Sequence, residues 1–381
     1  MGAARPHVGV METVRPLDQE ACYRAVSTRD ARFDGRFFGA VTSTGIYCRP
    51  VCPARTPRRE NMIFYPSAAA AEAAGFRACL RCRPETAPDM GAWRGASNTV
   101  TRALSLIEAG ALDEGDVDTL AGRLGVGERH LRRLFRQHLG AAPVSVAQTR
   151  RVLLAKALIH QTDLSMAQVA LASGFGSVRR FNETFQALYG RAPSALRRRR
   201  EQPGEVGGVR LSLSYRPPYD WTAMLAALDA RGDDVQAGRW MRRLTADIDG
   251  ADGVVRVAEG PPGRLDVRVE ASTLKALPGV LARVRRVFDL SADPEAIARD
   301  LSIDPALTPL VSARPGLRMA GDWIDAGDPA PSDRLPAEFD ARLIGRAERW
   351  RPWRAYGALH LRMGGVGADQ LTERDDDKAA A

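Results

Sequence analysis

The sequence holds few cysteines, five in 381 residues, and no stretch of about 18 consecutive apolar residues, the length that a membrane span needs. Its first twenty residues contain no apolar run of the kind that a secretory signal requires. These absences argue against a membrane protein and against a disulfide-rich secreted domain. We therefore expect a cytoplasmic protein whose thiols stay reduced.

Lysine is also scarce, because only three of the 55 basic residues are lysines. Such an arginine bias can follow from the base composition of a genome, so arginine abundance by itself says little about partners. The distribution of charge along the chain is better evidence about binding partners. Residues 121–200 carry 15 basic and three acidic side chains, whereas the whole chain has a net charge of +9. A positive field confined to one segment predicts a surface that binds nucleic-acid phosphates.

Four of the five cysteines form two close pairs, Cys48 with Cys52 and Cys79 with Cys82, with 26 residues between the pairs. Two short-spaced pairs in one small segment predict a single tetrahedral Zn²⁺ site made of four thiolates. Disulfides are a weaker interpretation, because they would leave Cys22 unpaired. The spacing alone favours a structural zinc site, since closed four-cysteine sites are usually structural.

The residues around these cysteines resemble the N-terminal zinc domain of Ada-type adaptive-response proteins. The resemblance lies in GIYCRPVC at 45–52, RENMIFY at 59–65 and AGFRACLRC at 74–82. It implies that Cys48 accepts a methyl group from a methylphosphotriester in DNA. It also implies that Thr44, Arg55 and Arg77 approach the DNA backbone.

Physical chemistry gives this transfer a rationale. Zinc holds cysteine as the nucleophilic thiolate at neutral pH, and four thiolates on Zn²⁺ carry a formal charge of −2. That charge repels ordinary phosphates, whereas a methylated phosphotriester is neutral and can approach. Methylation of Cys48 removes one negative charge, so the site then tolerates phosphate better and affinity for DNA rises. A thioether is not readily reversed, so each protein molecule would act once.

The zinc segment is predicted to span residues 21–86, after a flexible lead at 1–20 and before a linker at 87–98. Strand-like runs occupy 37–41 and 62–65, and an alanine-rich helix covers 67–74, with Ser67 as its N-cap and Gly75 as its C-cap. A segment this short has little core. Metal binding is therefore expected to supply much of its folding energy.

Residues 99–200 show helical periodicity that twice runs through a glycine-bearing turn, at 125–127 and about 46 residues later at 173–176. A long helix over 144–161 joins the two units. The second helix of each unit is apolar on one side and polar or basic on the other. The candidate DNA contacts on these faces are Arg129, Arg132 and Arg133 in the first unit and Ser177, Arg179, Arg180 and Asn182 in the second. His130, His138 and His160 have no partner at metal-binding spacing and are expected to be surface or packing residues.

The stretch QVALASGFGSVRRFNETF at 168–185, followed by Gly190 and Pro193, resembles the AraC/XylS DNA-binding domain. The resemblance implies sequence-specific binding to promoter DNA in a bacterial nucleoid, with RNA polymerase as a further partner. Two helix-turn-helix units in one chain can place two helices in successive major grooves without dimerisation.

The remaining sequence alternates between strand-like and amphipathic helical patterns. Strands are predicted at 211–215 and 265–269, and helices at 221–231 and 277–288. With the stretches YRPPYDW at 215–221 and ARPGLR at 313–318, residues 205–320 resemble the N-terminal α+β domain of AlkA-type 3-methyladenine DNA glycosylases. With RAERWRPWRAYGALH at 346–360, residues 321–362 resemble a truncated remnant of the C-terminal region of that enzyme. Asp333 falls near the position of the family's catalytic aspartate. Such a remnant predicts exposed apolar surface around Trp350 and Trp353, and a disordered tail at 363–381.

Together these patterns predict a multidomain α+β protein. It comprises a small four-cysteine zinc domain, an all-α double helix-turn-helix domain, and an α+β domain with an incomplete helical glycosylase remnant. The predicted function is that of a DNA alkylation sensor and transcriptional activator that consumes itself by methyl transfer to Cys48. Two alternatives remain, a base-excision glycosylase fused to a regulatory module and a zinc-stabilised regulator without transfer chemistry. No membrane partner is expected.

Overall fold

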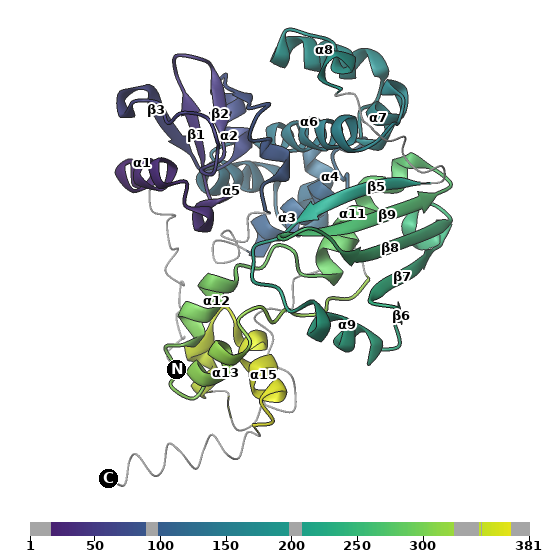
Figure 1. Cartoon of the computed structure of the whole chain (residues 1–381). Helices are drawn as coiled ribbons and strands as arrows, with labels where there is room; N and C mark the ends of the chain where they lie inside the picture. The colour runs from purple at the N-terminus through teal and green to yellow at the C-terminus, as the bar shows by residue number, and fades with distance from the viewer. Residues whose placement is uncertain (1–16, 89–97, 198–207, 324–342, 344, 367–381) are drawn as a thin grey trace, which may run out of the picture.

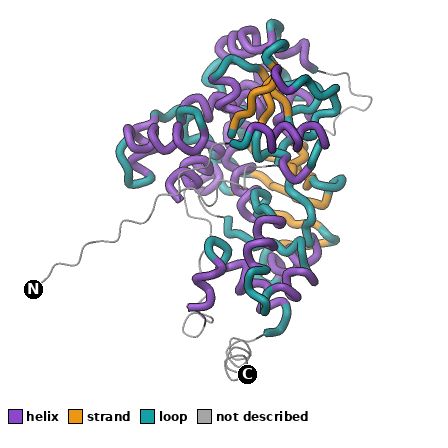
Figure 2. The backbone as a smooth tube through the Cα atoms, turned by 90° about the vertical axis from the view of Figure 1, so that its left-hand side faces the viewer, coloured by secondary structure: helices purple, strands orange, loops and turns teal. Residues whose placement is uncertain are grey.

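The computed structural model describes residues 17–88, 98–197, 208–323, 343 and 345–366. The described chain forms an N-terminal α+β domain, a helical region, a second α+β region with a five-stranded sheet, and a small helical cluster near the C-terminus (Figure 1). The strands fall into two separate groups with helices between and around them (Figure 2). Asp333 and residues 367–381 of the predicted tail lie outside the described residues. The tail was predicted to begin at residue 363, but Met363 ends a helix and Val366 packs against the C-terminal core, so for these residues the predicted disorder was wrong.

The N-terminal domain has a four-stranded sheet of order β3-β1-β2-β4. Its elements are α1 (Gln19–Thr28), β1 (Phe38–Val41), β2 (Ile46–Cys48), β3 (Met62–Tyr65), α2 (Ala68–Ala73) and β4 (Arg77–Ala78). The strands predicted at 37–41 and 62–65 and the helix predicted at 67–74 are confirmed. Ser67 caps α2 by accepting the Ala70 N–H at 3.0 Å. The C-cap residue is Ala74 rather than Gly75, which follows it at φ +90°.

Helix α1 begins inside the stretch predicted as a flexible lead. Asp18 caps it by accepting the backbone N–H groups of Glu20 and Ala21, which satisfies two of the four amide groups that a helix start leaves unpaired. The Gln19 side chain accepts the Phe64 N–H of strand β3 at 3.2 Å. These contacts fold residues 18–20 as part of the zinc domain, so for them the predicted lead was wrong.

The helical region contains two helix pairs on either side of one long helix. It consists of α3 (Asn98–Glu108), α4 (Val117–Arg123), α5 (Glu128–Leu139), α6 (Pro143–Gln161), α7 (Met166–Ala172) and α8 (Val178–Tyr189). The predicted long helix at 144–161 is confirmed as α6. Pro143 at the first turn of α6 suits a position whose N–H has no helical partner. Gly125 and Gly174 lie in the turns of the two pairs with φ of +70° and +86°, which glycine adopts at little cost.

The second sheet is antiparallel, with strand order β5-β9-β8-β7-β6. Its strands are β5 (Val209–Ser214), β6 (Asp234–Gln236), β7 (Arg239–Leu244), β8 (Gly253–Glu259) and β9 (Arg264–Ala271), and its helices are α9 (Trp221–Asp229), α10 (Ala246–Asp249) and α11 (Leu277–Val287). The predicted strands and helices of this region are confirmed. One apolar core joins the sheet to helices α6, α7 and α8, so the second helix-turn-helix unit and the α+β region pack as one body.

The C-terminal cluster is built from α12 (Pro294–Leu301), α13 (Thr308–Ala313), a 3₁₀ turn at Glu348–Trp350 and α15 (Arg354–Met363). The prediction of exposed apolar surface here was wrong. Trp350 is 1% exposed and Trp353 is 5% exposed, because helices α12 and α13 close over them. Both indole N–H groups are satisfied, Trp350 by Asp304 at 2.8 Å and Trp353 by Asp300 at 3.0 Å. The short segment thus forms its own core.

His360 makes this cluster sensitive to acid. The side chain is buried and its Nδ1 has no hydrogen-bond partner, and burial lowers its pKa from 6.5 to about 4. The unfolded chain binds this proton more readily than the folded chain does. The free energy of unfolding is therefore highest above about pH 6.5 and decreases by about 3 kcal/mol as the pH falls to about 4. We expect His360→Gln to remove this component, measured as the pH dependence of the unfolding free energy in urea, followed by tryptophan fluorescence. Identical pH dependence in both proteins would contradict this assignment.

Candidate metal centre and nucleic-acid interface

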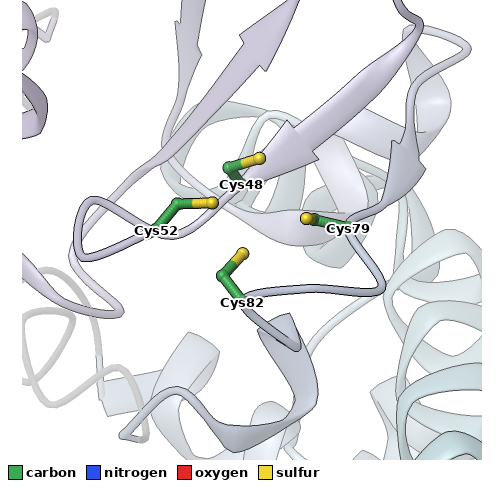
Figure 3. A group of neighbouring side chains, drawn as sticks. All are labelled: Cys48, Cys52, Cys79 and Cys82. Carbon is green, nitrogen blue, oxygen red and sulfur yellow. The ribbon is translucent and has the colours of Figure 1, made fainter. Parts of the chain in front are cut away.

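The four cysteines meet where two strands of the first sheet end (Figure 3). Strands β2 and β4 are parallel, with Tyr47 paired to Ala78, so the next residues, Cys48 and Cys79, lie side by side. Cys52 and Cys82 follow on the turns after these strands. All four Sγ atoms lie within 4.8 Å of one another. The strand register therefore aims two turns at one point.

This arrangement fits one Zn²⁺. Four ligands at the usual zinc–sulfur distance of about 2.3 Å place their sulfurs about 3.8 Å apart in a tetrahedron, within the spread observed here. Backbone N–H groups already point at two of the sulfurs, from Arg49 to Cys82 Sγ at 3.4 Å and from Arg81 to Cys79 Sγ at 3.3 Å. Such donors stabilise thiolates. The predicted cofactor is confirmed.

The four cysteine residues differ in their overall exposure to solvent. Cys52, Cys79 and Cys82 are buried, at 8–9% exposure, whereas Cys48 is partly exposed at the end of β2. Cys48 is therefore the residue of the cluster with the most surface open to solvent.

Arg49, next to Cys48, makes several contacts that stabilise the cysteine site. Its guanidinium pairs with both carboxylate oxygens of Asp34 and donates to the Cys82 carbonyl at 3.3 Å and to Thr86 Oγ1 at 2.6 Å. The arginine that follows the first cysteine thus ties the first cysteine turn to the second. Its side chain is occupied by these contacts.

Metal content tests the ligand set. We expect one zinc per chain, measured by elemental analysis after dialysis, and a loss of most of it in Cys79→Ser, because three thiolates hold zinc less tightly. Cys22→Ala should keep its zinc. Cys22 lies in an apolar cluster with Val26 and Phe37, and burial raises its pKa to about 11, so it is an unreactive packing residue. Zinc loss in Cys22→Ala, or full retention in Cys79→Ser, would contradict the assignment.

The candidate DNA contacts of the zinc domain lie near the cysteines. Thr44 is exposed in the turn between β1 and β2, and Arg55 is exposed just after Cys52. Arg77 is half-buried at the start of β4, two residues before Cys79. Their contact with DNA stays a prediction.

The candidate contacts of the helical region lie mostly on exposed faces of α5 and α8. Arg129, Arg133, Ser177, Arg179, Arg180 and Asn182 are exposed, whereas Arg132 is half-buried. Arg132 pairs with Glu128, and Arg179 with Glu183 at 2.8 Å. Ser177 is the N-cap of α8 and accepts the Arg180 N–H at 3.2 Å, so its hydroxyl has a structural role as well.

The histidines behave as packing or surface residues. His138 is buried, which lowers its pKa, whereas His130 is exposed with its ring beside Arg133. His160 is half-buried. Among the described residues, the four cysteines are the metal-binding cluster found. No helix in the described part of the chain is both long and apolar enough to cross a membrane.

Sequence reasoning missed one group of residues, the polar contacts that dock the zinc domain on α6. Lys156 of α6 pairs with Glu85 of the zinc domain at 2.8 Å, and both side chains are fully buried. Thr149 of α6 donates to Glu72 Oε2 at 2.6 Å, and Tyr47 donates to Glu72 Oε1 at 2.9 Å. One signal was available, since Lys156 is a rare lysine inside an apolar helical run.

Three family profiles match the chain in separate places. The metal binding domain of Ada matches residues 21–85, a helix-turn-helix domain matches 120–199, and the AlkA N-terminal domain matches 210–324. These matches follow the chain order predicted from the sequence. The domain boundaries themselves stay predictions.

Curated relatives carry the same combination. The chain is 39% identical over 311 residues to the "Probable bifunctional transcriptional activator/DNA repair enzyme AlkA" of Mycobacterium tuberculosis, which covers 79% of this chain and 62% of that protein. It is 30% identical to the "Bifunctional transcriptional activator/DNA repair enzyme AdaA" of Bacillus subtilis, over 46% of this chain and 81% of the relative. The Mycobacterium relative is therefore matched along less than two thirds of its length.

Solved structures also match. The "Crystal structure of the methylated N-ADA/DNA complex" shares 36% sequence identity and covers 36% of this chain and 99% of that chain, with a TM-score of 0.19. The "Refined structure of the DNA methyl phosphotriester repair domain of E. coli Ada" shares 47% identity and covers 19% of this chain and 80% of that chain, with a TM-score of 0.18. The TM-scores are too low to add to the fold argument, whereas the sequence identities agree with the profile matches.

Proposed function

Because the chain belongs to the Ada family of bifunctional transcriptional activators and DNA repair enzymes, we propose that it detects alkylated DNA by accepting a methyl group on Cys48 and then activates promoters. The observation that supports this role best is the exposure of the four cysteine residues, since Cys48 is the partly exposed member of an otherwise buried cluster. DNA is the substrate and the promoter partner, and RNA polymerase is a further proposed partner in the nucleoid.

The proposed transfer is a single displacement. The Cys48 Sγ electron pair forms a bond to the methyl carbon of a methylphosphotriester, while the bond from that carbon to the phosphate oxygen breaks. The departing oxygen keeps the bonding electrons, so the DNA regains an ordinary negatively charged phosphodiester. The protein gains an S-methyl thioether. When bound, Zn²⁺ keeps the sulfur as a thiolate at neutral pH.

The surroundings of Cys48 suit this substrate. Strand β2 and the Arg49 contacts to Asp34 and Thr86 hold the cysteine turn in place, so the sulfur is aimed before DNA arrives. Thr44 and Arg55 are exposed and available to hold neighbouring phosphates. Methylation lowers the negative charge of the cluster by one, and the surface then binds DNA phosphates more tightly.

Intact-mass analysis tests the proposed activity. Zinc-loaded full-length protein incubated with DNA that carries methylphosphotriesters should gain the mass of one methyl group, and peptide mapping should place it on Cys48. Unmethylated DNA of the same sequence is the control. A protein whose mass does not change, or a methyl group on another residue, would refute the proposal and favour a zinc-stabilised regulator without transfer chemistry.

Base-excision glycosylase activity is the alternative that the AlkA N-terminal match brings. Such an enzyme needs an enclosed aromatic pocket for the flipped base. In the described C-terminal cluster, Trp350, Trp353 and Tyr356 are buried as core residues, so their rings are packed against the protein rather than exposed to a substrate. The candidate catalytic Asp333 lies outside the described residues. Release of 3-methyladenine from alkylated DNA, abolished by Asp333→Asn, would establish this second activity.

A further inference from the structure

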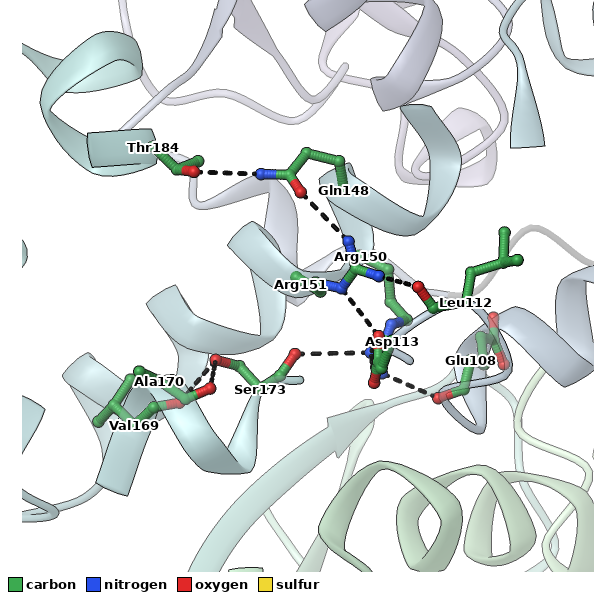
Figure 4. Close-up of polar contacts among 10 residues, drawn as sticks. All are labelled: Glu108, Leu112, Asp113, Gln148, Arg150, Arg151, Val169, Ala170, Ser173 and Thr184. Atoms are coloured by element: carbon green, nitrogen blue, oxygen red, sulfur yellow. Dashed lines mark hydrogen bonds and ion pairs between the residues drawn. The ribbon is translucent and has the colours of Figure 1, made fainter. Parts of the chain in front are cut away.

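One acidic side chain holds two arginines of the long helix that joins the two helix-turn-helix units. Asp113, in the loop between α3 and α4, accepts hydrogen bonds from Arg150 Nη2 at 2.6 and 2.7 Å and from Arg151 Nε at 2.8 Å (Figure 4). The three side chains are only 10–15% exposed. Both arginines come from α6, the helix that joins the two units. Charge-assisted bonds of this kind are stronger than neutral ones and fix the geometry of the groups they join.

The same arginines also bind backbone carbonyl groups, two just before the first unit and one in the turn of the second. Arg151 donates to the Leu112 carbonyl, and Arg150 Nη1 donates to the Glu108 carbonyl at 3.1 Å, both on the side of the first unit. Arg150 Nη2 also reaches the Ser173 carbonyl at 3.5 Å, in the turn between α7 and α8. This cluster thus spans from the loop before one unit to the turn of the other. We refer to Asp113, Arg150 and Arg151 as the clamp.

The turn of the second unit is shaped around the clamp. A side chain at Gly174 would place its Cβ 2.1 Å from Asp113 Oδ2 and 2.8 Å from Arg150 Nη2. Glycine at this position therefore admits the carboxylate as well as the φ of +86°. The clamp also continues to helix α8. Arg151 Nη1 donates to Gln148 Oε1 at 3.3 Å, and Gln148 Nε2 donates to Thr184 Oγ1 of α8 at 3.4 Å.

We propose that the clamp is a positioning device that sets the distance and rotation between helices α5 and α8, and thereby the number of base pairs between the two half-sites that the protein accepts. The proposal rests on the proposed promoter binding. Adding one base pair moves a half-site by about 3.4 Å and turns it by about 35° around the duplex. If the two units are held rigidly, the protein selects one gap, meaning one number of base pairs between the half-sites. If the units can pivot, it tolerates several gaps.

Selection of binding sites from a random DNA pool tests the clamp, because the enriched sequences themselves define the operator. The variant is Asp113→Asn, which keeps the side-chain size and removes the charge. The matched control is Asp118→Asn, which changes an exposed aspartate in α4 of the first unit. Both variants remove one negative charge, so a general change in electrostatic attraction to DNA would affect both. A second variant, Arg150→Met, removes the clamp from the other side. All proteins are full-length and zinc-loaded.

We expect the wild type and Asp118→Asn to enrich two half-site motifs at one fixed gap. Asp113→Asn and Arg150→Met should enrich the same two motifs at several gaps, with affinity for the wild-type gap reduced about tenfold. An unchanged single gap would overturn the proposal. Loss of both motifs together would also overturn it, because the clamp would then support folding of the units rather than their spacing. A wild-type pool without any motif would instead refute the proposed promoter binding itself, and the role of the clamp with it.

Discussion

Replacing Cys48 with serine is expected to abolish methyl transfer and, with it, the rise in promoter affinity after DNA alkylation. Serine has a hydroxyl of much higher pKa than a zinc-bound thiol, so far less of it is present as the nucleophilic anion at neutral pH. We expect the rate of methyl transfer per bound zinc to fall by more than about a thousandfold. The measurement is the mass change of the protein after incubation with methylphosphotriester DNA.

Two controls separate chemistry from loss of metal. Zinc content is measured in the same samples, so that transfer is expressed per metal-loaded molecule. Thr44→Ala leaves all four thiolates in place and should slow transfer only modestly, because one backbone contact is lost while the nucleophile remains. Methyl transfer at the wild-type rate in zinc-loaded Cys48→Ser would contradict the assigned nucleophile.

Lys156→Met is expected to destabilise the protein by about 3 kcal/mol, because it leaves the buried carboxylate of Glu85 without its main partner. Burial alone would raise the pKa of Glu85, yet the charge and hydrogen bond of Lys156 hold it below its usual value. Since the folded-state pKa is lowered, this stabilisation is present above about pH 4.5 and is lost as the pH falls through the lower folded-state value. The free energy of unfolding in urea at neutral pH measures the effect.

The neighbouring carboxylate provides a matched comparison at the same interface. Glu72 of the zinc domain also lies at the interface with α6. Its partners are the hydroxyl groups of Tyr47 and Thr149, and burial raises its pKa. Glu72→Gln should therefore change stability by less than about 1 kcal/mol. The double variant Lys156→Met with Glu85→Gln should recover much of the loss, because it also removes the buried carboxylate charge that Lys156 neutralises, leaving Arg83 as a remaining neighbour of residue 85. A loss in Glu72→Gln as large as that in Lys156→Met would contradict the account.

The metal centre and the helical units were predictable because their signals are local. Two cysteine pairs define a tetrahedral site whatever the rest of the fold, and strands β2 and β4 supply the register that brings Cys48 beside Cys79. Likewise, the glycine-bearing turns and the 3.6-residue spacing predicted the helix pairs and the long helix α6.

Contacts between distant segments were not predictable in the same way. Lys156 and Glu85 are 71 residues apart, and nothing in either neighbourhood specifies the other. The burial of Trp350 and Trp353 also depends on separate segments, because α12 and α13 cover them and Asp300 and Asp304 accept their indole N–H groups. The clamp is a third set of contacts that the sequence did not predict. Asp113 meets Arg150 and Arg151 only because of the way the two units pack against helix α6.

The most direct test compares the affinity of zinc-loaded protein for its selected DNA site before and after stoichiometric methylation of Cys48, at fixed salt concentration. The account predicts that methylation raises affinity at least about tenfold, because one negative charge near the phosphates is removed. Equal affinity of the two forms, with methylation of Cys48 confirmed by mass, would contradict the central claim.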